Sequence, residues 1–138
     1  MPITLEIITP DRVVMREPVD FVQARGEEGE LGILPGHTPF FTSLATDLLL
    51  VRRGQDEEIV AVMGGFMEVR PDHVTVLSPA AERAAEIDEL RAKEAEGRAK
   101  VVVDRERTAE AEAALSRALV RLRAIELVGL SRKLRKQG

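Results

Sequence analysis

The distribution of proline constrains the fold of this chain more than any other feature of its sequence. All seven prolines lie before residue 80, and none lies between residues 88 and 130, where Ala, Glu, Arg, Leu and Lys dominate. Proline removes a backbone donor and breaks the interior of a helix, so long helices are expected only in the second stretch. The chain should therefore contain two parts that differ in secondary structure.

Short apolar runs alternate with turn residues in the first part. Residues 3–7 alternate apolar and polar side chains, and the apolar runs at 48–51, 59–63, 66–69 and 74–77 are separated by turns that contain Gly, Pro or Asp. Apolar alternation with a period of two, and turns roughly every 8–12 residues, are typical of antiparallel strands. This pattern predicts an antiparallel sandwich or barrel.

The apolar residues of the second part follow a helical period instead. One row steps by three and four residues through Ala92, Ala95, Ala99 and Val102; another consists of Ala111, Leu115, Ala118, Leu122 and Ile125. Each row would form one face of a helix. The polar stretch 104–108 lies between them and favours an antiparallel two-helix hairpin, with one uninterrupted helix as the alternative.

The start of the first helix is open from the residues alone, because Ser78-Pro79 and Asp88 would each suit a helix N-terminus. Alanine dominates the first row, and a buried methyl contributes about 0.8 kcal/mol, against about 1.5–3 kcal/mol for a buried Leu or Ile. Such a hairpin could open while its helices keep their internal hydrogen bonds, so it could switch between folded and extended forms. A rigid hairpin is the alternative.

Several classes of function are excluded by what the sequence lacks. It has no Cys, Trp or Tyr, only two histidines, and no glycine-rich phosphate loop, so we expect no enzyme, no metal site and no stacking platform for nucleic acid. No apolar run reaches the roughly 20 residues of a membrane helix, and the N-terminus lacks the pattern of a signal peptide. These absences predict a soluble, cytoplasmic protein.

Charge is divided unevenly along the chain. Residues 1–81 hold 6 basic and 13 acidic side chains, a net charge of −7, whereas residues 82–138 hold 14 and 11, a net charge of +3. Within residues 113–138, seven basic side chains face only Glu126. This asymmetry suggests a tail that meets an acidic partner. The alternative is a solvated helix end whose cations complement the helix dipole.

The run from Gly29 to Pro39 (GELGILPGHTP) places an apolar tripeptide between tight turns. It resembles the G-x-x-G-I-L-P-G-H-x-P signature of the ε subunits of F-type ATP synthases, which are called δ in mitochondria. Further similar segments follow in the family's order, at 9–11, 62–69 (VMGGFMEV), 74–77, 81–88 and 119–127 (LVRLRAIEL). Asp47 stands where the family often has Gly before a strand, which leaves the type of that turn open.

The resemblance implies an α+β fold. An N-terminal antiparallel β-sandwich of about ten strands would occupy residues 1–86, and a C-terminal two-helix antiparallel hairpin would occupy residues 87–138. It also implies a short last strand near residues 81–84 and a first helix that begins at Asp88.

The resemblance further implies a non-catalytic subunit of the rotor stalk, which binds the γ subunit and the ring of c subunits. It would couple proton translocation to ATP synthesis, as a peripheral protein at the cytoplasmic face of the bacterial cell membrane, and would require no cofactor. The segment expected to meet the c-ring and γ is Glu30, Leu31, Gly32, Ile33, Leu34, Pro35, Gly36 and His37. We expect its apolar side chains to turn partly inward, and Glu30 and His37 to point outward.

The helical hairpin would be a regulatory arm by the same resemblance. In its extended form it would reach the α and β subunits and inhibit ATP hydrolysis. The residues expected to contact an acidic segment of β are Arg117, Arg121, Arg123, Arg132 and Lys133.

Residues 87–92 (IDELRA) resemble the [IL]-D-x-x-R-A motif that binds ATP in some bacterial ε subunits. ATP would then be a regulatory ligand, and its candidate contacts are Glu82, Ile87, Asp88, Arg91, Ala92, Arg117 and Arg121. The alternative role of Asp88 is to cap its helix and pair with Arg91. The alternative function for the whole chain is a freestanding sensor that responds to ATP.

Overall fold

The structure is a computed structural model that describes residues 2–137 and, of these, the side chains up to residue 128. The chain divides into two compact units, Met1–Arg83 and Ala84–Gly138. We call them the strand unit and the helical unit. The division falls three residues before the boundary that the sequence suggested.

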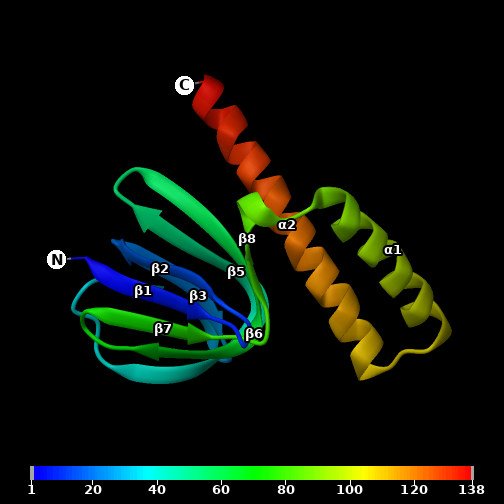
Figure 1. The fold of residues 1–138 in the computed structure, drawn as a ribbon, viewed down its shortest axis with the longest axis horizontal. Helices are drawn as coiled ribbons and strands as arrows, with labels where there is room; N and C mark the ends of the chain where they lie inside the picture. Colours follow the sequence, from blue (N-terminus) through cyan, green and yellow to red (C-terminus); the bar gives the residue numbers. More distant parts are fainter. Residues whose placement is uncertain (1, 138) are drawn as a thin grey trace. The chain divides into compact units, whose positions relative to one another are not determined.

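The strand unit contains eight strands in one curled sheet (Figure 1). They are β1 (Ile3–Ile8), β2 (Val13–Val19), β3 (Phe21–Gly26), β4 (Gly29–Ile33), β5 (Phe40–Arg53), β6 (Asp56–Val69), β7 (His73–Leu77) and β8 (Ala81–Arg83). The order in the sheet is β2-β1-β7-β6-β5-β3-β4, and β8 pairs with β6. The pairs are antiparallel except for β1 with β7, which is parallel because a long crossover, and not a hairpin, joins these two strands.

Two strands of 14 residues, β5 and β6, carry the sheet round the core. Residues 60–62 of β6 pair with β8, whereas residues 66–69 pair with β7, so the two halves of β6 have different neighbours. Between the halves lie Gly64 and Gly65, with φ of +79° and +114°. Counting each half of β5 and β6 separately gives the ten segments that the resemblance implied.

No turn interrupts β5 at Asp47, so the turn that we expected there is wrong. Asp47 pairs with Val62 across the sheet. Its carboxylate accepts a hydrogen bond from the Leu48 N–H at 2.7 Å and lies 3.8 Å from Arg25 Nε. These polar partners allow an aspartate, which usually disfavours strands, to lie within this one.

The core of the strand unit consists of large aliphatic side chains from nearly every strand. Alternate residues of β1 are fully buried, as the period of two predicts. The largest fully buried side chains are Ile3, Leu5, Ile7, Met15, Ile33, Leu49 and Met67. Because side chains alternate along a strand, the residues between these buried ones point to the outward face of the sheet.

The helical unit contains a 3-10 turn, η1 (Ala84–Glu86), and two helices, α1 (Glu89–Arg105) and α2 (Ala109–Gln137). Asp88 caps α1 by accepting a hydrogen bond from the Arg91 N–H at 3.1 Å. Thr108 caps α2 through its hydroxyl, which accepts from the Ala111 N–H at 3.1 Å. The predicted helix start at Asp88 and the hairpin are confirmed, and a single uninterrupted helix is excluded.

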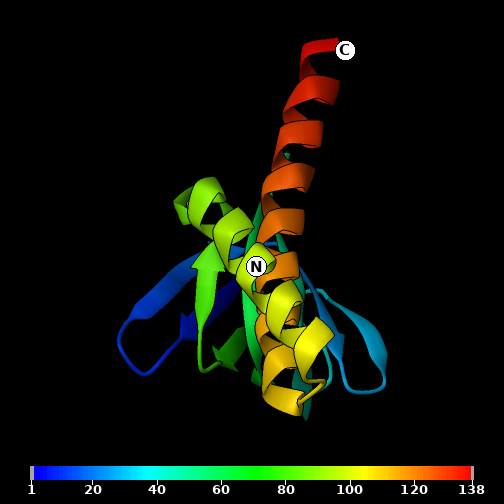
Figure 2. The same cartoon turned by 90° about the vertical axis from the view of Figure 1, so that its right-hand side faces the viewer.

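Alanines are the most deeply buried residues of the predicted rows on α1 and α2, and Leu115, Leu122 and Ile125 of the second row are half-buried. Ala92, Ala99, Ala111 and Ala118 are each at most 7% exposed. Val102 was expected on the same face, but it is 49% exposed, whereas the next residue, Val103, is half-buried. The longer α2 extends past the start of α1 (Figure 2). Neither helix, within the described residues, is long and apolar enough to span a membrane.

Candidate functional site

A row of exposed apolar side chains crosses the outward face of five strands. Val13 of β2 pairs with Ile8 of β1, Ile8 with Leu77 of β7, and Leu77 with Phe66 of β6. Phe41 of β5 stacks on Phe66, with the ring centroids 5.5 Å apart. Four of these five side chains are exposed by 45–63%, and Ile8 is partly exposed. We call Val13, Ile8, Leu77, Phe66 and Phe41 the apolar row.

The pleat of the sheet explains why these side chains point outward. The residues next to them in the chain, Ile7, Val76 and Met67, are fully buried in the core. Because side chains alternate along a strand, Ile8, Leu77 and Phe66 must face outward. Single exposed apolar residues are common on protein surfaces, whereas a contiguous set on one face marks an interaction site. The apolar row is therefore the strongest candidate for a docking surface in the strand unit.

A polar row lies beside the apolar row on the same face of the sheet, two residues away from it on β1, β6 and β7. Glu68 pairs with Thr75, Thr75 with Glu6, and Glu6 with Arg16. Arg16 Nη2 lies 2.9 Å from Glu6 Oε2, and His73 Nε2 lies 2.7 Å from Glu6 Oε1. The hydrogen bond from Arg16, and the Arg16 charge with a smaller contribution from His73, lower the pKa of the Glu6 carboxyl despite some desolvation. The polar row thus gives the apolar row a charged border.

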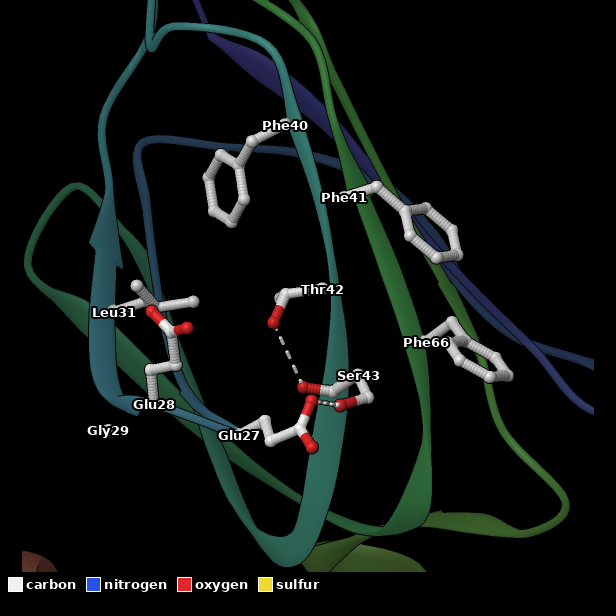
Figure 3. A pocket seen from close by; sticks show the side chains of 9 residues that line it. All are labelled: Glu27, Glu28, Gly29, Leu31, Phe40, Phe41, Thr42, Ser43 and Phe66. Carbon is white, nitrogen blue, oxygen red and sulfur yellow. Dashed lines mark hydrogen bonds between the residues drawn. The ribbon is translucent and has the colours of Figure 1, made fainter.

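A pocket of about 630 Å³ opens beside Phe41 and Phe66 (Figure 3). Leu31 and Phe40 pack against the core and line its inner side, and Glu27 and Glu28 lie on the turn between β3 and β4. The Ser43 hydroxyl donates to Glu27 Oε2 at 2.8 Å. We call this the acidic pocket. Its remaining lining residues are Gly29, Phe41, Thr42, Ser43 and Phe66.

The predicted segment Glu30–His37 begins in β4 and continues into the loop before β5. Ile33 is fully buried and Leu31 is half-buried against the core, so the expected inward turn of the apolar side chains is confirmed for these two. Leu34, however, is 57% exposed. Glu30 is exposed and His37 is half-buried. The His37 ring lies 5.3 Å from that of Phe40, so this segment adjoins the acidic pocket.

The Leu-Pro-Gly-His turn within this segment is held by the backbone. Gly36 has a φ of +81°, and its N–H donates to the Pro71 carbonyl at 2.7 Å. Pro35 and Gly36 are exposed, as is Gly32. The turn therefore presents Leu34 on a loop that is tied to the end of β6.

The structure divides the candidate nucleotide residues between the two units. Glu82 lies in β8, and the other six belong to the helical unit. The Asp88 carboxylate caps α1, which is the alternative role that the sequence offered. Arg91 is exposed and Ala92 is buried in the hairpin. Ile87 is half-buried beside them.

The candidate contacts for a β subunit lie on α2. Arg117 and Arg121 are half-buried and one helical turn apart, and Arg123 is exposed. The side chains of Arg132 and Lys133 lie outside the described residues. Among the described residues, no group of His, Asp and Glu side chains is arranged to hold a metal ion.

Sequence reasoning missed a cluster of ion pairs in the strand unit. Arg53 lies 2.6 Å from both Glu17 and Glu58, and Arg83 pairs with both of these carboxylates. Burial raises the pKa of Glu58, but the hydrogen bonds and charges of Arg83 and Arg53 outweigh it, so the pKa is lowered. The hydrogen bond to Glu58 has the opposite effect on the guanidinium of Arg83, whose pKa it raises. The cluster fastens β8, the last strand before the helical unit, to β2, β5 and β6.

Comparison with known proteins identifies similar chains. Residues 2–84 match the model of the ATP synthase Delta/Epsilon chain, beta-sandwich domain. The ATP synthase epsilon chain of Syntrophobacter fumaroxidans is 50% identical over 128 residues, which cover 90% of this chain and 96% of that one. The ATP synthase epsilon chain of Herpetosiphon aurantiacus is 49% identical over 132 residues, 92% and 96% of the two chains.

A solved structure is similar over both units. A chain of the OSCP/F1/c-ring assembly of the Euglena gracilis mitochondrial ATP synthase matches with a TM-score of 0.65 and 26% sequence identity. The match covers 94% of this chain and 81% of the Euglena chain.

Proposed function

Because the chain belongs to the family of ATP synthase ε subunits, we propose that it acts in the rotor stalk of a bacterial F-type ATP synthase as a non-catalytic subunit. In this role the strand unit binds the γ subunit and the c-ring, and the protein couples proton translocation to ATP synthesis. It is held at the cytoplasmic face of the cell membrane through the complex.

The apolar row is the observation that carries this proposal. Phe41, Phe66 and Leu77 are each at least 50% exposed, yet they are contiguous across three paired strands. Apolar side chains gain free energy when a partner covers them, at roughly 25 cal/mol per Å². We assign the γ subunit to this surface, and the segment Glu30–His37 to the polar loops of the c-ring.

Replacing Phe66 tests the proposal. We expect Phe66→Ser to weaken binding of the γ subunit at least tenfold in calorimetry, because it introduces a hydroxyl into the centre of the apolar row. Phe66→Leu keeps the surface apolar and should retain binding within about threefold, which separates lost contact from general disturbance. Wild-type affinity in Phe66→Ser, with its fold intact by circular dichroism, would contradict the assignment.

The helical unit supplies the regulatory part of the proposal. The hairpin is closed by alanines, and α2 carries a cationic end, which fits an arm that opens and meets acidic surfaces of the α and β subunits. Deleting residues 88–138 should raise ATP hydrolysis by the assembled enzyme and leave assembly intact. Unchanged hydrolysis would count against an inhibitory arm.

We propose ATP as a regulatory ligand of the helical unit, with Arg91, Arg117 and Arg121 as its phosphate contacts. Guanidinium groups suit phosphate oxygens because they can donate two parallel hydrogen bonds. Calorimetric titration of the isolated protein tests this, with Arg117→Ala/Arg121→Ala as the variant. If millimolar ATP produces no heat of binding, ATP is not a regulatory ligand of this protein. A protein that binds ATP, ignores γ and does not purify with α, β, γ and c would instead be the freestanding sensor.

A further inference from the structure

The acidic pocket differs from the apolar row in charge, although both include Phe41 and Phe66. Most carboxylates on the strands of this unit have a cationic partner: Glu6 has Arg16, Glu68 has Arg70, and Glu58 has Arg53 and Arg83. Among the described residues, Glu27 and Glu28 have none. Two carboxylates at the rim of a pocket therefore lack the countercharge that Glu6, Glu58 and Glu68 possess.

One of these carboxylates is held in position. Glu27 Oε2 accepts from the Ser43 hydroxyl at 2.8 Å, and the Glu27 N–H donates to the Ser43 carbonyl at 3.1 Å. The turn from β3 to β4 is thereby tied to β5, with Glu27 beside Ser43; Glu28 lies beside Leu31, on the other side of β5 from Phe41 and Phe66 (Figure 3). A carboxylate with one oxygen engaged in this way still has lone pairs for a donor from a partner.

The pocket also offers aromatic carbon beside Glu27, because Ser43, which donates to Glu27, pairs with Phe66 across the sheet. The stacked rings of Phe41 and Phe66 are 63% and 51% exposed. A cation over such a ring is attracted by its quadrupole, and the planar guanidinium of arginine suits this geometry better than an ammonium. The same protein contains this arrangement elsewhere, because Arg52 Cζ lies 4.7 Å from the centroid of the Phe21 ring.

From this combination we propose that the acidic pocket receives an arginine side chain of the γ subunit, which stacks on the Phe41–Phe66 pair and donates to Glu27, while Glu28 adds negative charge on the Leu31 side of the pocket. The inference rests on the proposed binding of γ to the adjoining apolar row. The row supplies contact area, whereas the arginine fixes the register of the two surfaces. A charge pair at the border of an apolar contact selects one alignment, and truncating one partner of a desolvated pair also weakens binding.

The first test removes both negative charges from the pocket. Glu27→Gln/Glu28→Gln should weaken γ binding about tenfold in calorimetry, and should reduce the dependence of the affinity on salt between roughly 50 and 300 mM. The control is Asp56→Asn/Glu57→Gln, which removes two exposed carboxylates at the turn between β5 and β6. This control should bind γ within about twofold of wild type.

The Phe66→Ser variant separates this inference from the proposed function. If Phe66→Ser weakens γ binding while Glu27→Gln/Glu28→Gln binds γ like the control, the proposed arginine contact is wrong and the proposed docking surface is supported. If neither variant changes the affinity, both proposals fall. Thermal melts by circular dichroism verify that each variant is folded.

The second test identifies the arginine on the partner. Each surface arginine of γ is changed to lysine and titrated against wild type and against Glu27→Gln/Glu28→Gln. We expect one Arg→Lys change to weaken binding to wild type about fivefold and to have little effect with the variant, because lysine keeps the charge but loses the planar fork. If no arginine of γ shows this coupling, the assignment is overturned.

Discussion

The two units of this chain bury different kinds of side chain. The largest fully buried residues of the strand unit are Ile, Leu, Met and Val, whereas the buried residues of α1 and α2, up to residue 128, are alanines and Val120. A fully buried large aliphatic side chain contributes about 1.5–3 kcal/mol, and a buried methyl about 0.8 kcal/mol. The comparison teaches that two compact units of one chain can be held by buried side chains of very different size.

The ion pairs of the two units also differ, in the distance along the chain between the residues that they join. In the strand unit, Arg53 and Arg83 bridge residues as far apart in sequence as Glu17 and Glu58. In the helical unit, Glu89 with Lys93 and Glu96 with Lys100 lie on exposed helix surface four residues apart. Pairs of the second kind support a helix without tying it to anything else. They survive if the helices separate.

The largest effect is expected at Gly65. A Cβ at this position would lie 2.0 Å from the Leu77 carbonyl oxygen, and the φ of +114° suits only glycine. Gly65→Ala should therefore destabilise the strand unit by more than about 4 kcal/mol, or prevent its folding. Urea denaturation followed by circular dichroism measures this, because loss of the strand signal is distinct from loss of the helical signal.

A matched change in the helical unit has the opposite sign, and is the smallest effect that we expect. Nothing lies within 4 Å of a Cβ built on Gly97 of α1, whose backbone is helical. Gly97→Ala should stabilise α1 by about 0.5–1 kcal/mol. A destabilising Gly97→Ala would show that the exposed side of α1 is packed in the free protein.

Core truncation ranks second. Leu49 is 1% exposed in β5, so Leu49→Ala should cost the strand unit about 3 kcal/mol through lost contacts and a cavity. Ala118→Gly removes a methyl that is 1% exposed in α2 and lowers helix propensity, and should cost the helical unit about 1–2 kcal/mol.

Hydrogen exchange can measure the effects of Leu49→Ala and Ala118→Gly separately, because it reports the stability of each unit from its own backbone amides. Faster exchange of strand amides in Ala118→Gly would show that the units unfold together, and would break the comparison.

The third prediction concerns pH. The folded pKa of Glu58 lies below its ordinary value of 4.5, so its ion pairs contribute fully above that pH and are lost as the pH falls below it. The stability of the strand unit should therefore decline from about pH 5 downward. Glu58→Gln should cost about 1–2 kcal/mol at pH 7, because it leaves Arg53 and Arg83 half-buried with less countercharge.

The same variant should make the urea midpoint of the strand unit less dependent on pH between 3 and 5. Glu89→Gln, which removes a carboxylate from an exposed pair of α1, is the control. It should change stability by less than about 0.5 kcal/mol. An equal response in both variants would mean that the cluster around Glu58 is no stronger than a surface pair.

Local sequence rules succeeded where the structure depends on neighbouring residues. Asp88 was a candidate cap because its carboxylate can reach the N–H three residues on, and it does so. The reversal within 104–108 followed from its polarity, and the structure places the helix ends at Arg105 and Ala109. The apolar side chain of Ile33 lies inward as expected, although the run between turns that the sequence indicated includes the strand β4.

The rest depends on residues that are distant in the sequence. The cluster joins Glu17, Arg53, Glu58 and Arg83, and the acidic pocket joins the 27–31 segment to Phe40 and Phe66. Strand continuity through Asp47 depends on Arg25 and Val62, which only the folded sheet brings near. Neither a pocket nor an ion-pair cluster of this kind leaves a periodic signal in a sequence.

The parallel pairing of β1 with β7 has a consequence during synthesis. β1 lies inside the sheet, so its second neighbour does not exist until the ribosome has released residues 73–77. Closing this pair brings together segments about 70 residues apart, which slows folding relative to a hairpin. The strand unit can nevertheless finish folding before α1 and α2 emerge, because all of its strands precede residue 84. The strand unit can therefore be complete while the helical unit is still leaving the ribosome.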